Sequence, residues 1–264
     1  MGAMETKVLR SVMDVDGLYE DLDGSFPNHE ANPLKTETLT NLQKKVKEGS
    51  YDFGVAFDGD ADRAGFLDEK GGIIPMDIIS ALVARDILAK QKGVILYDLR
   101  SSWAVKEIIE ENHGTPMMSR VGHAFIKQQM RDNNAVFAGE LSGHYYFREN
   151  YFTESSAMAV LCVANIVSKS DQPLSELVKP IIRYHTSGEI NSKVTDTSAV
   201  LERLKTKYSD GHLLELDGIS VEYDDWWFNV RSSNTEPLIR LNLEAKTKTT
   251  MEEKRDELLS VIRS

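Results

Sequence analysis

The stretch YDFGVAFDGDADRAGFLDEKGG, residues 51–72, places three alternating carboxylates directly after an apolar run. Residues 51–57 predict a strand, and residues 64–67 predict a returning strand that is closed by the turn residues 69–72. The carboxylates therefore lie in a loop at the end of a strand. Outward from this stretch, strand-like and helix-like segments alternate along most of the chain, which is typical of α/β layers.

The alternation continues to about residue 168 and then changes. Helices are expected over residues 36–48, 77–90, 103–111 and 123–131, and strands over 94–97, 116–119 and 135–138. After the polar segment 168–180, a strand, a helix, several strands and a closing helix are expected over 188–194, 198–208, 213–243 and from 251. The predicted fold is α/β, with mixed, mostly parallel sheets and flanking helices, followed by a small C-terminal α+β domain.

Composition excludes several classes of protein. The chain has 264 residues, with 42 acidic and 31 basic side chains and a net charge of -11, which disfavours binding to nucleic acid or anionic membranes. The apolar run 157–167 is shorter than the roughly 20 residues that span a bilayer. Its Cys162 is the sole cysteine, which favours a reducing, cytoplasmic location. The opening Met-Gly-Ala-Met lacks a signal-peptide core and is typical of an expression remnant, so we expect the chain to begin inside a longer protein.

The loop carboxylates Asp58, Asp60 and Asp62 are hard oxygen ligands whose mutual repulsion a divalent cation relieves. Mg²⁺ is the favoured ion, because it uses few protein ligands and lets a phosphate complete its coordination. A solvated acidic turn is the simplest alternative. An EF-hand Ca²⁺ loop, with Glu69 at position 12, is a second alternative, but Arg63 occupies the position that requires glycine. Arg63 is suited either to orient a phosphate or to pair with one of the aspartates.

Other polar loops also follow predicted strands. Residues 231–235, Arg-Ser-Ser-Asn-Thr, offer a guanidinium, hydroxyls and an amide that suit a phosphate, although such a sequence is often only a turn. Residues 139–144, Gly-Glu-Leu-Ser-Gly-His, offer a carboxylate, a hydroxyl and an imidazole that suit sugar hydroxyls. Residues 98–101 and 120–123 place cations and imidazole at helix starts, where capping and ion pairing are the alternative roles.

Together these loops resemble those of the phosphohexomutases, the phosphomannomutase/phosphoglucomutase family. The matching segments are FPNHEANPL (26–34), AFDGDADR (56–63), DLRSS (98–102), VGHAFIK (121–127), GELSGHYYF (139–147) and RSSNTEP (231–237). They occur in family order and span nearly the whole chain, which makes chance similarity improbable. Members of this family are isomerases, formally intramolecular phosphotransferases. They interconvert a hexose 1-phosphate and its 6-phosphate through a bisphosphate.

The resemblance implies a role for each matched position. The metal ligands for Mg²⁺ would be Asp58, Asp60 and Asp62. The catalytic set would be Arg63, which helps hold a phosphoserine, His144 and His123 beside the reacting hydroxyl, and Arg100 and Lys127 as electrostatic support. The substrate-binding set would be Glu140 and Ser142 for sugar hydroxyls, and Arg231, Ser232, Ser233, Asn234 and Thr235 for the phosphate that is not transferred. The partners would be phosphorylated hexoses, with a hexose 1,6-bisphosphate as activator.

One part of the family pattern has no counterpart, because no Ser-His-Asn-Pro-type segment that would carry the phosphoserine occurs here. The resemblance therefore divides the chain into part of domain 2 (1–72), domain 3 (73–184) and a C-terminal phosphate-binding domain (185–264). We expect this chain alone to be inactive, and we expect self-association through the incomplete domain 2. Phosphoglucosamine mutase, a non-catalytic sugar-phosphate-binding module and a Ca²⁺-binding structural protein are the alternatives.

Overall fold

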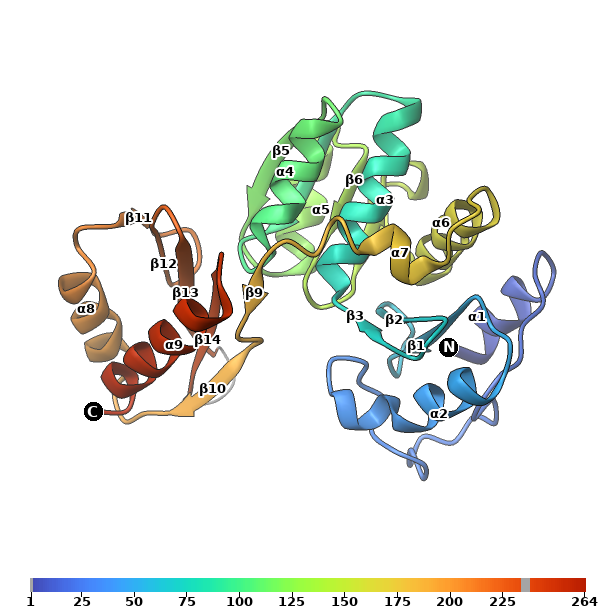
Figure 1. Ribbon diagram of the computed structural model, residues 1–264, viewed down its shortest axis with the longest axis horizontal. Coiled ribbons are helices and arrows are strands. Elements are labelled where there is room, and N and C mark those ends of the chain that lie inside the picture. The colour runs from blue at the N-terminus through green and yellow to red at the C-terminus, as the bar shows by residue number, and fades with distance from the viewer. Residues whose placement is uncertain (1, 234–237) are drawn as a thin grey trace. The chain divides into compact units, whose positions relative to one another are not determined.

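A computed structural model describes residues 2–233 and 238–264 of the chain (Figure 1). The chain divides into two compact units. The first comprises Met1–Met118 and Gly122–Ile182, and the second comprises Ser119–Val121 and Arg183–Ser264. Among the described residues, no helix has both the length and the apolar character that crossing a bilayer requires.

The first unit contains two sheets and their helices. Its helices are α1 (Gly2–Leu9), η1 (Thr36–Leu39), α2 (Thr40–Glu48), α3 (Met76–Lys90), α4 (Trp103–Glu111), α5 (His123–Asp132), η2 (Arg148–Asn150), α6 (Ser156–Ser168) and α7 (Leu174–Val178). Its strands are β1 (Phe53–Phe57), β2 (Ala64–Asp68), β3 (Ile73–Ile74), β4 (Val94–Asp98), β5 (Thr115–Ser119), β6 (Phe137–Gly139), β7 (Tyr145–Phe147) and β8 (Thr153–Glu154). The expected hairpin of β1 and β2 is confirmed, as is the α/β class.

The two sheets of the first unit differ in strand direction. The smaller sheet has the order β1-β2-β3 and is antiparallel, because short turns join its strands. The larger has the order β5-β4-β6-β7-β8, in which β4 and β6 are parallel, whereas β7 and β8 pair antiparallel with their neighbours. This mixed sheet carries its polar loops at the ends of β4 and β6, so residues after Asp98 and Gly139 lie on the same edge.

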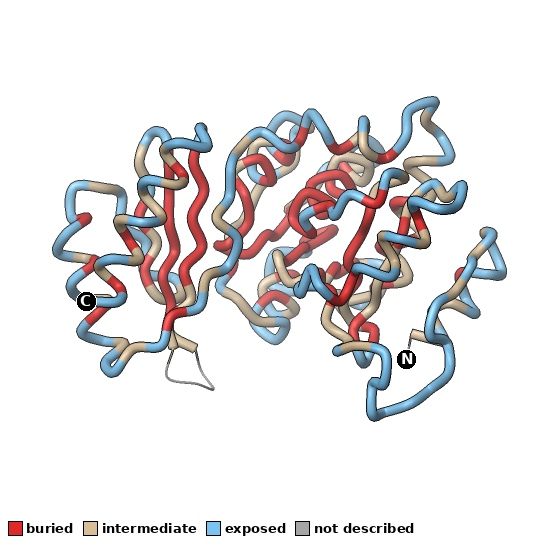
Figure 2. Tube along the Cα trace, turned by 60° about the horizontal axis from the view of Figure 1, so that its bottom comes forward, coloured by how far each residue is buried: buried red, intermediate tan, exposed pale blue. Residues whose placement is uncertain are grey.

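Helices cover both faces of the larger sheet. A Cβ on Gly139 would lie 2.1 Å from Oγ of Ser80, so α3 packs against the backbone of β6 on one face. On the other face, Ile126 and Met130 of α5 join a core with Leu96 and Ala138. The buried residues follow the strands and the inner sides of these helices (Figure 2). Ser102 caps α4 as expected, because its Oγ accepts a hydrogen bond from Ala104 N at 3.1 Å.

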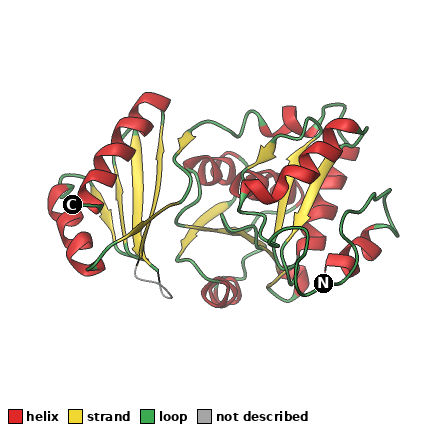
Figure 3. Cartoon of the chain, turned by 90° about the horizontal axis from the view of Figure 1, so that it is seen from below, coloured by secondary structure: helices red, strands yellow, loops and turns green. Residues whose placement is uncertain are grey.

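The described residues of the second unit form an antiparallel sheet with helices on one face (Figure 3). Its elements are β9 (His185–Thr186), β10 (Ile190–Lys193), α8 (Thr197–Lys207), β11 (His212–Leu214), β12 (Ile219–Glu222), β13 (Trp226–Ser232), β14 (Leu238–Ala245) and α9 (Lys248–Ile262). The sheet order is β10-β14-β13-β12-β11, with β9 beside β14. Leu204 of α8 and Leu258 of α9 pack on Phe228 and Leu241 in one buried core.

A carboxylate of α9 ties the two helices of this unit together. Glu257 accepts hydrogen bonds from Tyr208 Oη at 3.0 Å and from Lys254 Nζ at 3.0 Å, and Lys207 Nζ lies 3.0 Å from it. Burial alone would raise the pKa of Glu257, but the bonds from Lys207, Lys254 and Tyr208 outweigh burial and lower the pKa to about 2. The folded state therefore favours the ionised carboxylate.

We expect Glu257→Gln to lower the free energy of unfolding at pH 7 by about 1 kcal/mol, because solvent screens this partly exposed network. The pKa of Glu257 is depressed in the folded state, so its contribution is present above the ordinary pKa of 4.5 and is lost as the pH falls toward about 2. Urea unfolding from pH 7 to pH 2.5 should show the difference from the parent chain shrinking below pH 4.5. Glu253→Gln, on the exposed side of α9, is the matched control and should change little.

Candidate functional site

The carboxylate loop joins β1 to β2 within the first unit. One carboxylate oxygen each from Asp58, Asp60 and Asp62 lies within 4.8 Å of the others. Asp58 is buried, and its Oδ2 accepts a hydrogen bond from Arg63 Nε at 2.6 Å. The loop is flanked by strands on both sides, whereas an EF-hand requires flanking helices, so the geometry does not fit that alternative.

The three carboxylates perturb one another. Burial raises the pKa of Asp62, and the negative charges of Asp58 and Asp60 raise it further, although the His144 imidazole opposes this rise. Burial would also raise the pKa of Asp58, but the hydrogen bonds and the positive charge of Arg63 outweigh burial and lower it. The loop therefore concentrates negative charge that one arginine neutralises only in part.

This donor set fits a hard divalent cation. Three carboxylates supply oxygen ligands within reach of a single ion, and their repulsion is of the kind that a cation relieves. Asp58, Asp60 and Asp62 are the residues that would hold it.

The loop between β6 and β7 lies directly against the carboxylate loop. Ala64 N donates to the carbonyl of Gly143 at 3.0 Å, and Arg63 and His144 form an antiparallel bridge. Gly143 has φ 89°, and a Cβ there would lie 2.6 Å from Met76 Sδ and 3.1 Å from the carbonyl oxygen of Ala64. A side chain at this position is disfavoured by both the backbone angle and the contact. Glycine therefore allows the two loops to dock.

We expect Gly143→Ala to destabilise the folded chain by about 1–3 kcal/mol, because alanine strains the backbone and meets Met76 and Ala64. Chemical denaturation followed by circular dichroism measures this difference. Gly24→Ala is the matched control, because Gly24 has no heavy atom within 4 Å of its would-be Cβ, and this change should stay within about 0.5 kcal/mol. Equal effects of the two substitutions would contradict the docking role of Gly143.

His144 connects the two loops through its ring nitrogens. Its Nε2 lies 3.3 Å from Asp62 Oδ2, and its Nδ1 lies 3.1 Å from Glu140 Oε2 and 2.8 Å from Ser142 Oγ. Burial lowers the pKa of His144, but the hydrogen bond to Glu140 and the charges of Glu140 and Asp62 outweigh burial and raise it. The cationic form has an N–H for each carboxylate, and this form is the one the surroundings favour.

Glu140 is buried at 1% exposure and is held by several donors. Its Oε2 accepts a hydrogen bond from Tyr146 Oη at 2.6 Å, and its Oε1 accepts one from Gly122 N at 3.2 Å. Burial, and then the charge and hydrogen bond of Glu140, raise the pKa of Tyr146, so the phenol stays protonated and donates. Any further hydrogen-bond donor that binds Glu140 must therefore use a remaining lone pair of this carboxylate.

Arg100 is anchored by Asp98 at the carboxyl end of β4. Asp98 is fully buried and accepts hydrogen bonds from Arg100 Nη2 at 2.7 Å, Arg100 Nε at 3.1 Å and Arg100 N at 2.8 Å. Its Oδ2 also accepts a bond from Leu141 N at 2.8 Å, and Arg100 Nη2 lies 4.0 Å from Glu140 Oε1. One carboxylate thus positions both Arg100 and the loop that carries Glu140.

His123 and Lys127 lie one turn apart on α5, and Glu154 joins them. Lys127 Nζ donates to Glu154 Oε1 at 2.9 Å and lies 3.2 Å from His123 Nδ1. His123 is exposed, and its Nδ1 is 3.6 Å from Glu154 Oε1. Glu154 Oε2 is buried without a hydrogen-bond partner among the described residues. The first unit thus contains Arg63, Arg100, His123, Lys127 and His144, the predicted catalytic set, and contacts involving Gly122 and Gly143 link the loops that carry them.

The predicted phosphate loop belongs to the second unit. Arg231 is the last residue but one of β13 and has 8% exposure. Its Nη2 donates to Glu189 Oε2 at 2.8 Å, and Arg240 Nη1 donates to Glu189 Oε1 at 3.3 Å. Arg231 and Arg240 are cross-strand partners, so both guanidiniums lie on one face of the sheet. Gly218, at φ 67°, approaches this strand so closely that a Cβ would lie 2.3 Å from the carbonyl oxygen of Val230.

The rest of that loop is only partly described. Ser232 and Ser233 are half-buried, and Ser233 N donates to Leu238 O at 2.9 Å. Asn234 and Thr235 lie outside the described residues. Sequence reasoning missed Asp98, Glu154, Glu189 and Tyr146 as partners of the predicted residues. Asp98 and Tyr146 belong to the segments DLRSS and GELSGHYYF, so the sequence offered a signal for both. No local pattern marks Glu154 or Glu189.

The fold and this site define an α/β protein of more than one compact unit. Its acidic loop between β1 and β2 suits a cation, and this loop packs on the polar loop between β6 and β7. Comparison with known proteins gives the family. Models described as phosphoglucomutase/phosphomannomutase alpha/beta/alpha domain II, alpha/beta/alpha domain III and C-terminal domain match residues 2–72, 75–184 and 189–261. The chain belongs to the phosphoglucomutase/phosphomannomutase family, as the sequence motifs indicated.

Individual relatives agree with this assignment. A phosphomannomutase of Methanocaldococcus jannaschii is 44% identical over 260 residues, which cover 98% of this chain and 58% of the relative. A protein of Xanthomonas campestris pv. campestris named phosphohexose mutases is 42% identical over 247 residues, covering 92% of this chain and 55% of the relative. A solved structure of a phosphoglucomutase/phosphomannomutase family protein from Burkholderia thailandensis has a TM-score of 0.90 at 28% identity, over 99% of this chain and 57% of that chain. The chain thus spans somewhat more than half the length of these relatives.

Proposed function

We propose that this chain is part of a phosphohexomutase that interconverts a hexose 1-phosphate and the 6-phosphate through a bisphosphate intermediate. The relatives named phosphomannomutase and phosphohexose mutases support this proposal. The observation that carries it is the docking of the two loops, in which His144 lies 3.3 Å from Asp62 and 3.1 Å from Glu140. The three-part division into residues 1–72, 73–184 and 185–264 belongs to the same proposal.

In this proposal the chain supplies charge and alignment to phosphoryl transfer. A sugar hydroxyl oxygen bonds to the phosphorus of a phosphoserine as the bond from phosphorus to the serine oxygen breaks, and the proton of the hydroxyl passes on to the released serine oxygen. Mg²⁺ held by Asp58, Asp60 and Asp62 would neutralise developing charge on the phosphoryl oxygens. Arg63 and Arg100 add positive charge, and the cationic form of His144 suits proton donation.

The remaining proposed residues bind the substrate. Glu140 and Ser142 hold sugar hydroxyls, and Arg231, Ser232, Ser233, Asn234 and Thr235 hold the phosphate that is not transferred. His123 and Lys127 belong instead to the catalytic set, with His123 beside the reacting hydroxyl and Lys127 as electrostatic support. The phosphoserine lies on polypeptide outside residues 1–264, and a hexose 1,6-bisphosphate activates the complete enzyme. The chain alone is inactive in this proposal. A cytoplasmic location remains a prediction that rests on the single Cys162.

Calorimetric titration of the purified chain with glucose 6-phosphate, mannose 6-phosphate and glucosamine 6-phosphate tests the binding half of this proposal. We expect Arg231→Ala to weaken binding about 10- to 100-fold, because it removes charge-assisted hydrogen bonds to the phosphate. Arg255→Ala, which removes an arginine paired with its neighbour Asp256, should bind like the parent chain. Preference for glucosamine 6-phosphate would favour a phosphoglucosamine mutase.

A turnover assay tests the catalytic half. Glucose 1-phosphate with catalytic glucose 1,6-bisphosphate and Mg²⁺ should give no product with this chain alone, since the chain has no serine loop of the family type. Sustained turnover would contradict a phosphoserine located elsewhere. Binding of sugar phosphate without turnover, even after a complementing serine domain is added, would favour the non-catalytic binding module.

A further inference from the structure

Ser156 makes a hydrogen bond that joins helix α6 to the carboxylate loop. Its Oγ donates to the carbonyl oxygen of Ala61 at 2.6 Å, and the two residues lie 95 positions apart in the sequence. Ser156 is 1% exposed and Ala61 is 5% exposed, so water hardly competes for this bond. Serine hydroxyls in helices usually bond to backbone groups of their own segment, whereas this one fixes the position of a distant loop.

Ala61 has a backbone conformation that alanine rarely adopts. It lies between Asp60 and Asp62, and its φ of 59° is in the left-handed region. The β-carbon disfavours this region, so such a residue persists where its surroundings hold it. Here Ala61 N donates to the carbonyl of Asp58 at 3.3 Å, and the carbonyl of Ala61 accepts the bond from Ser156. The shape of the loop therefore depends on a bond from outside the loop.

This conformation accompanies the gathering of the carboxylates. With Ala61 at positive φ, one oxygen each from Asp58, Asp60 and Asp62 lies within 4.8 Å of the others. The negative charges repel one another, so a loop without a cation favours conformations that separate them. A return of Ala61 to negative φ would relieve the strain of this residue and move Asp60 relative to Asp62. The bond from Ser156 opposes that return.

Ser156 lies on a firmly held part of the fold. It is the first residue of α6, and Ser155 caps this helix, because Ser155 Oγ accepts a hydrogen bond from Met158 N at 3.2 Å. Ser155 N also donates to the carbonyl of Tyr145 in β7 at 2.9 Å. The start of α6 is thus tied to the larger sheet, and Ser156 passes this fixed position on to Ala61.

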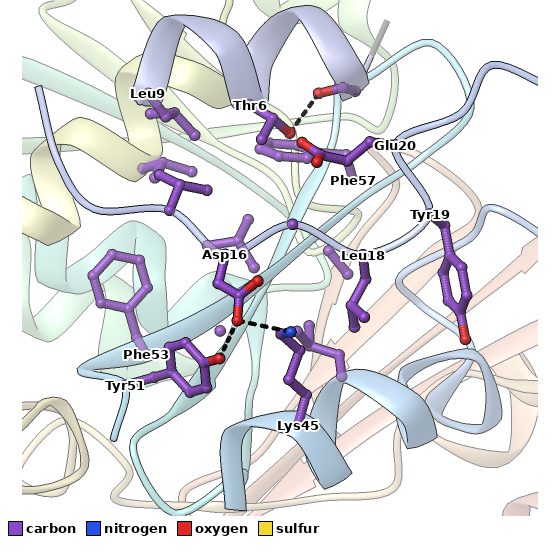
Figure 4. A pocket seen from close by; sticks show the side chains of 18 of the residues that line it. Thr6, Leu9, Asp16, Leu18, Tyr19, Glu20, Lys45, Tyr51, Phe53 and Phe57 are labelled. Atoms are coloured by element: carbon purple, nitrogen blue, oxygen red, sulfur yellow. Dashed lines mark hydrogen bonds and ion pairs between the residues drawn. The ribbon is translucent and has the colours of Figure 1, made fainter. Parts of the chain in front are cut away.

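Apolar packing gives the loop less support on the side of β1. A cavity of about 1410 Å³ lies beside the end of this strand, and Figure 4 shows Phe57 in its lining. Asp58 and Gly59 of the loop also line the cavity, as do Val160 and Leu161 of α6. Atoms that face a cavity lose packing contacts on that side. Individual hydrogen bonds such as that of Ser156 therefore contribute more to the shape of the loop.

We propose that Ser156 is a positioning residue for the carboxylate loop, because its hydrogen bond holds Ala61 in the left-handed conformation that gathers Asp58, Asp60 and Asp62 around one Mg²⁺. This inference rests on the proposed function in taking Mg²⁺ as the ion. It adds a residue that supplies no ligand atom and lies outside the loop. The conformation of the loop without metal tests the role of Ser156 separately from metal binding.

NMR on the whole chain measures both the loop and the ion. A positive φ shortens the distance between HN and Hα of the same residue, so Ala61 should give a strong intraresidue NOE in the metal-free parent chain. Titration with MgCl₂, followed on the amides of Gly59 and Arg63, gives the Kd. We expect Ser156→Ala to weaken this NOE and to raise the Kd about tenfold, because loss of a residue that orients metal ligands typically costs about 10- to 100-fold in affinity.

A matched control and a rescue separate positioning from general stability. Ser155→Ala removes the neighbouring helix cap, so it should lower the thermal midpoint but leave the Kd for Mg²⁺ within about twofold of the parent value. Ala61→Gly combined with Ser156→Ala should bind Mg²⁺ about threefold more tightly than Ser156→Ala alone, because glycine adopts positive φ without support. A merely structural role predicts no such gain, since glycine makes the unfolded chain more flexible.

Three results would overturn the proposal. Ala61 could keep its strong NOE in Ser156→Ala, whether or not the chain binds Mg²⁺. Ser156→Ala could have the Kd of the parent chain, or the double variant could bind no better than Ser156→Ala. Failure of the parent chain to bind Mg²⁺ would contradict the ion of the proposed function, and the NOE of Ala61 would then decide the role of Ser156.

A second variant covers the case in which Ser156→Ala does not fold. Ser156→Cys keeps a side chain of similar size with a weaker donor. It should weaken the NOE of Ala61 and raise the Kd for Mg²⁺, by less than about tenfold. An NOE and a Kd equal to those of the parent chain would contradict the role of the Ser156 hydroxyl.

Discussion

Asp98→Asn is expected to destabilise the folded chain by about 3–5 kcal/mol, because it leaves the buried Arg100 guanidinium without its counter-ion. Asp98 accepts hydrogen bonds from Arg100 and from Leu141 N. Asparagine keeps the shape of the side chain, but its NH₂ group is a donor and cannot accept these bonds. The loss is large against the 5–15 kcal/mol that typically holds a domain folded. Urea denaturation at pH 7 measures it.

A matched control and a double variant identify the cause. Asp132→Asn changes an exposed aspartate at the end of α5 and should shift the unfolding free energy by less than about 0.5 kcal/mol. Asp98→Asn combined with Arg100→Met should recover part of the lost stability, because no buried charge is then unpaired. A double variant as unstable as the sum of its single changes would contradict the role given to this ion pair.

The same change should loosen the loop that carries Glu140. Leu141 N loses its carboxylate acceptor, so its amide should exchange faster in Asp98→Asn than in the parent chain. Amides of β2, which belongs to the other sheet of this unit, should change less. A uniform increase across the first unit would indicate global destabilisation alone and would not support a positioning role for Asp98.

Asp60→Asn is expected to weaken binding of Mg²⁺ by at least tenfold. Substitution of a residue that only hydrogen-bonds to a metal ligand typically lowers metal affinity 10- to 100-fold. Asp60 is itself a proposed ligand, so we expect an effect of at least this size. Asp60 is the most exposed of the three aspartates, so the substitution removes charge with little cost in packing. Thermal unfolding with and without Mg²⁺ reads the effect, because a ligand at 100 times its Kd stabilises by about 2.7 kcal/mol.

The apo protein provides the control for this prediction. Without metal, Asp60→Asn should be as stable as the parent chain or more so, since it reduces repulsion with Asp58 and Asp62. Asp52→Asn, an exposed aspartate outside the carboxylate loop, should leave the Mg²⁺ response intact. An Asp60→Asn variant that responds to Mg²⁺ like the parent chain would exclude Asp60 as a ligand.

Much of the fold could be predicted from local patterns. Apolar spacing and the Ser102 cap placed α4 at the residues where the structure has it, and the turn-bounded run after Tyr51 placed the β1–β2 hairpin. Helix α1 was not predicted, because residues 2–9 show no helical apolar stripe in the sequence. Its position depends on packing against α6, which no local pattern contains.

The candidate site could also be predicted only in part. The polar loops were predictable, since residues after Phe57 and Gly139 follow strands and carry side chains suited to cations and hydroxyls. Their partners were not predictable, because pairs such as Lys127 with Glu154 join residues 27 positions apart. Arg231 with Glu189 spans 42 positions, and only the strand register of the second unit brings them together. Contacts between residues this far apart in the sequence leave no periodic pattern in it.

We expect Asp58, Asp60 and Asp62 together to hold one divalent cation. The most direct measurement is a crystal of this chain soaked in Mn²⁺, with anomalous difference density used to locate the ion. We expect one strong peak in contact with a carboxylate oxygen of each aspartate. A well-ordered loop without a peak at saturating Mn²⁺, or a peak held by other residues alone, would contradict the account.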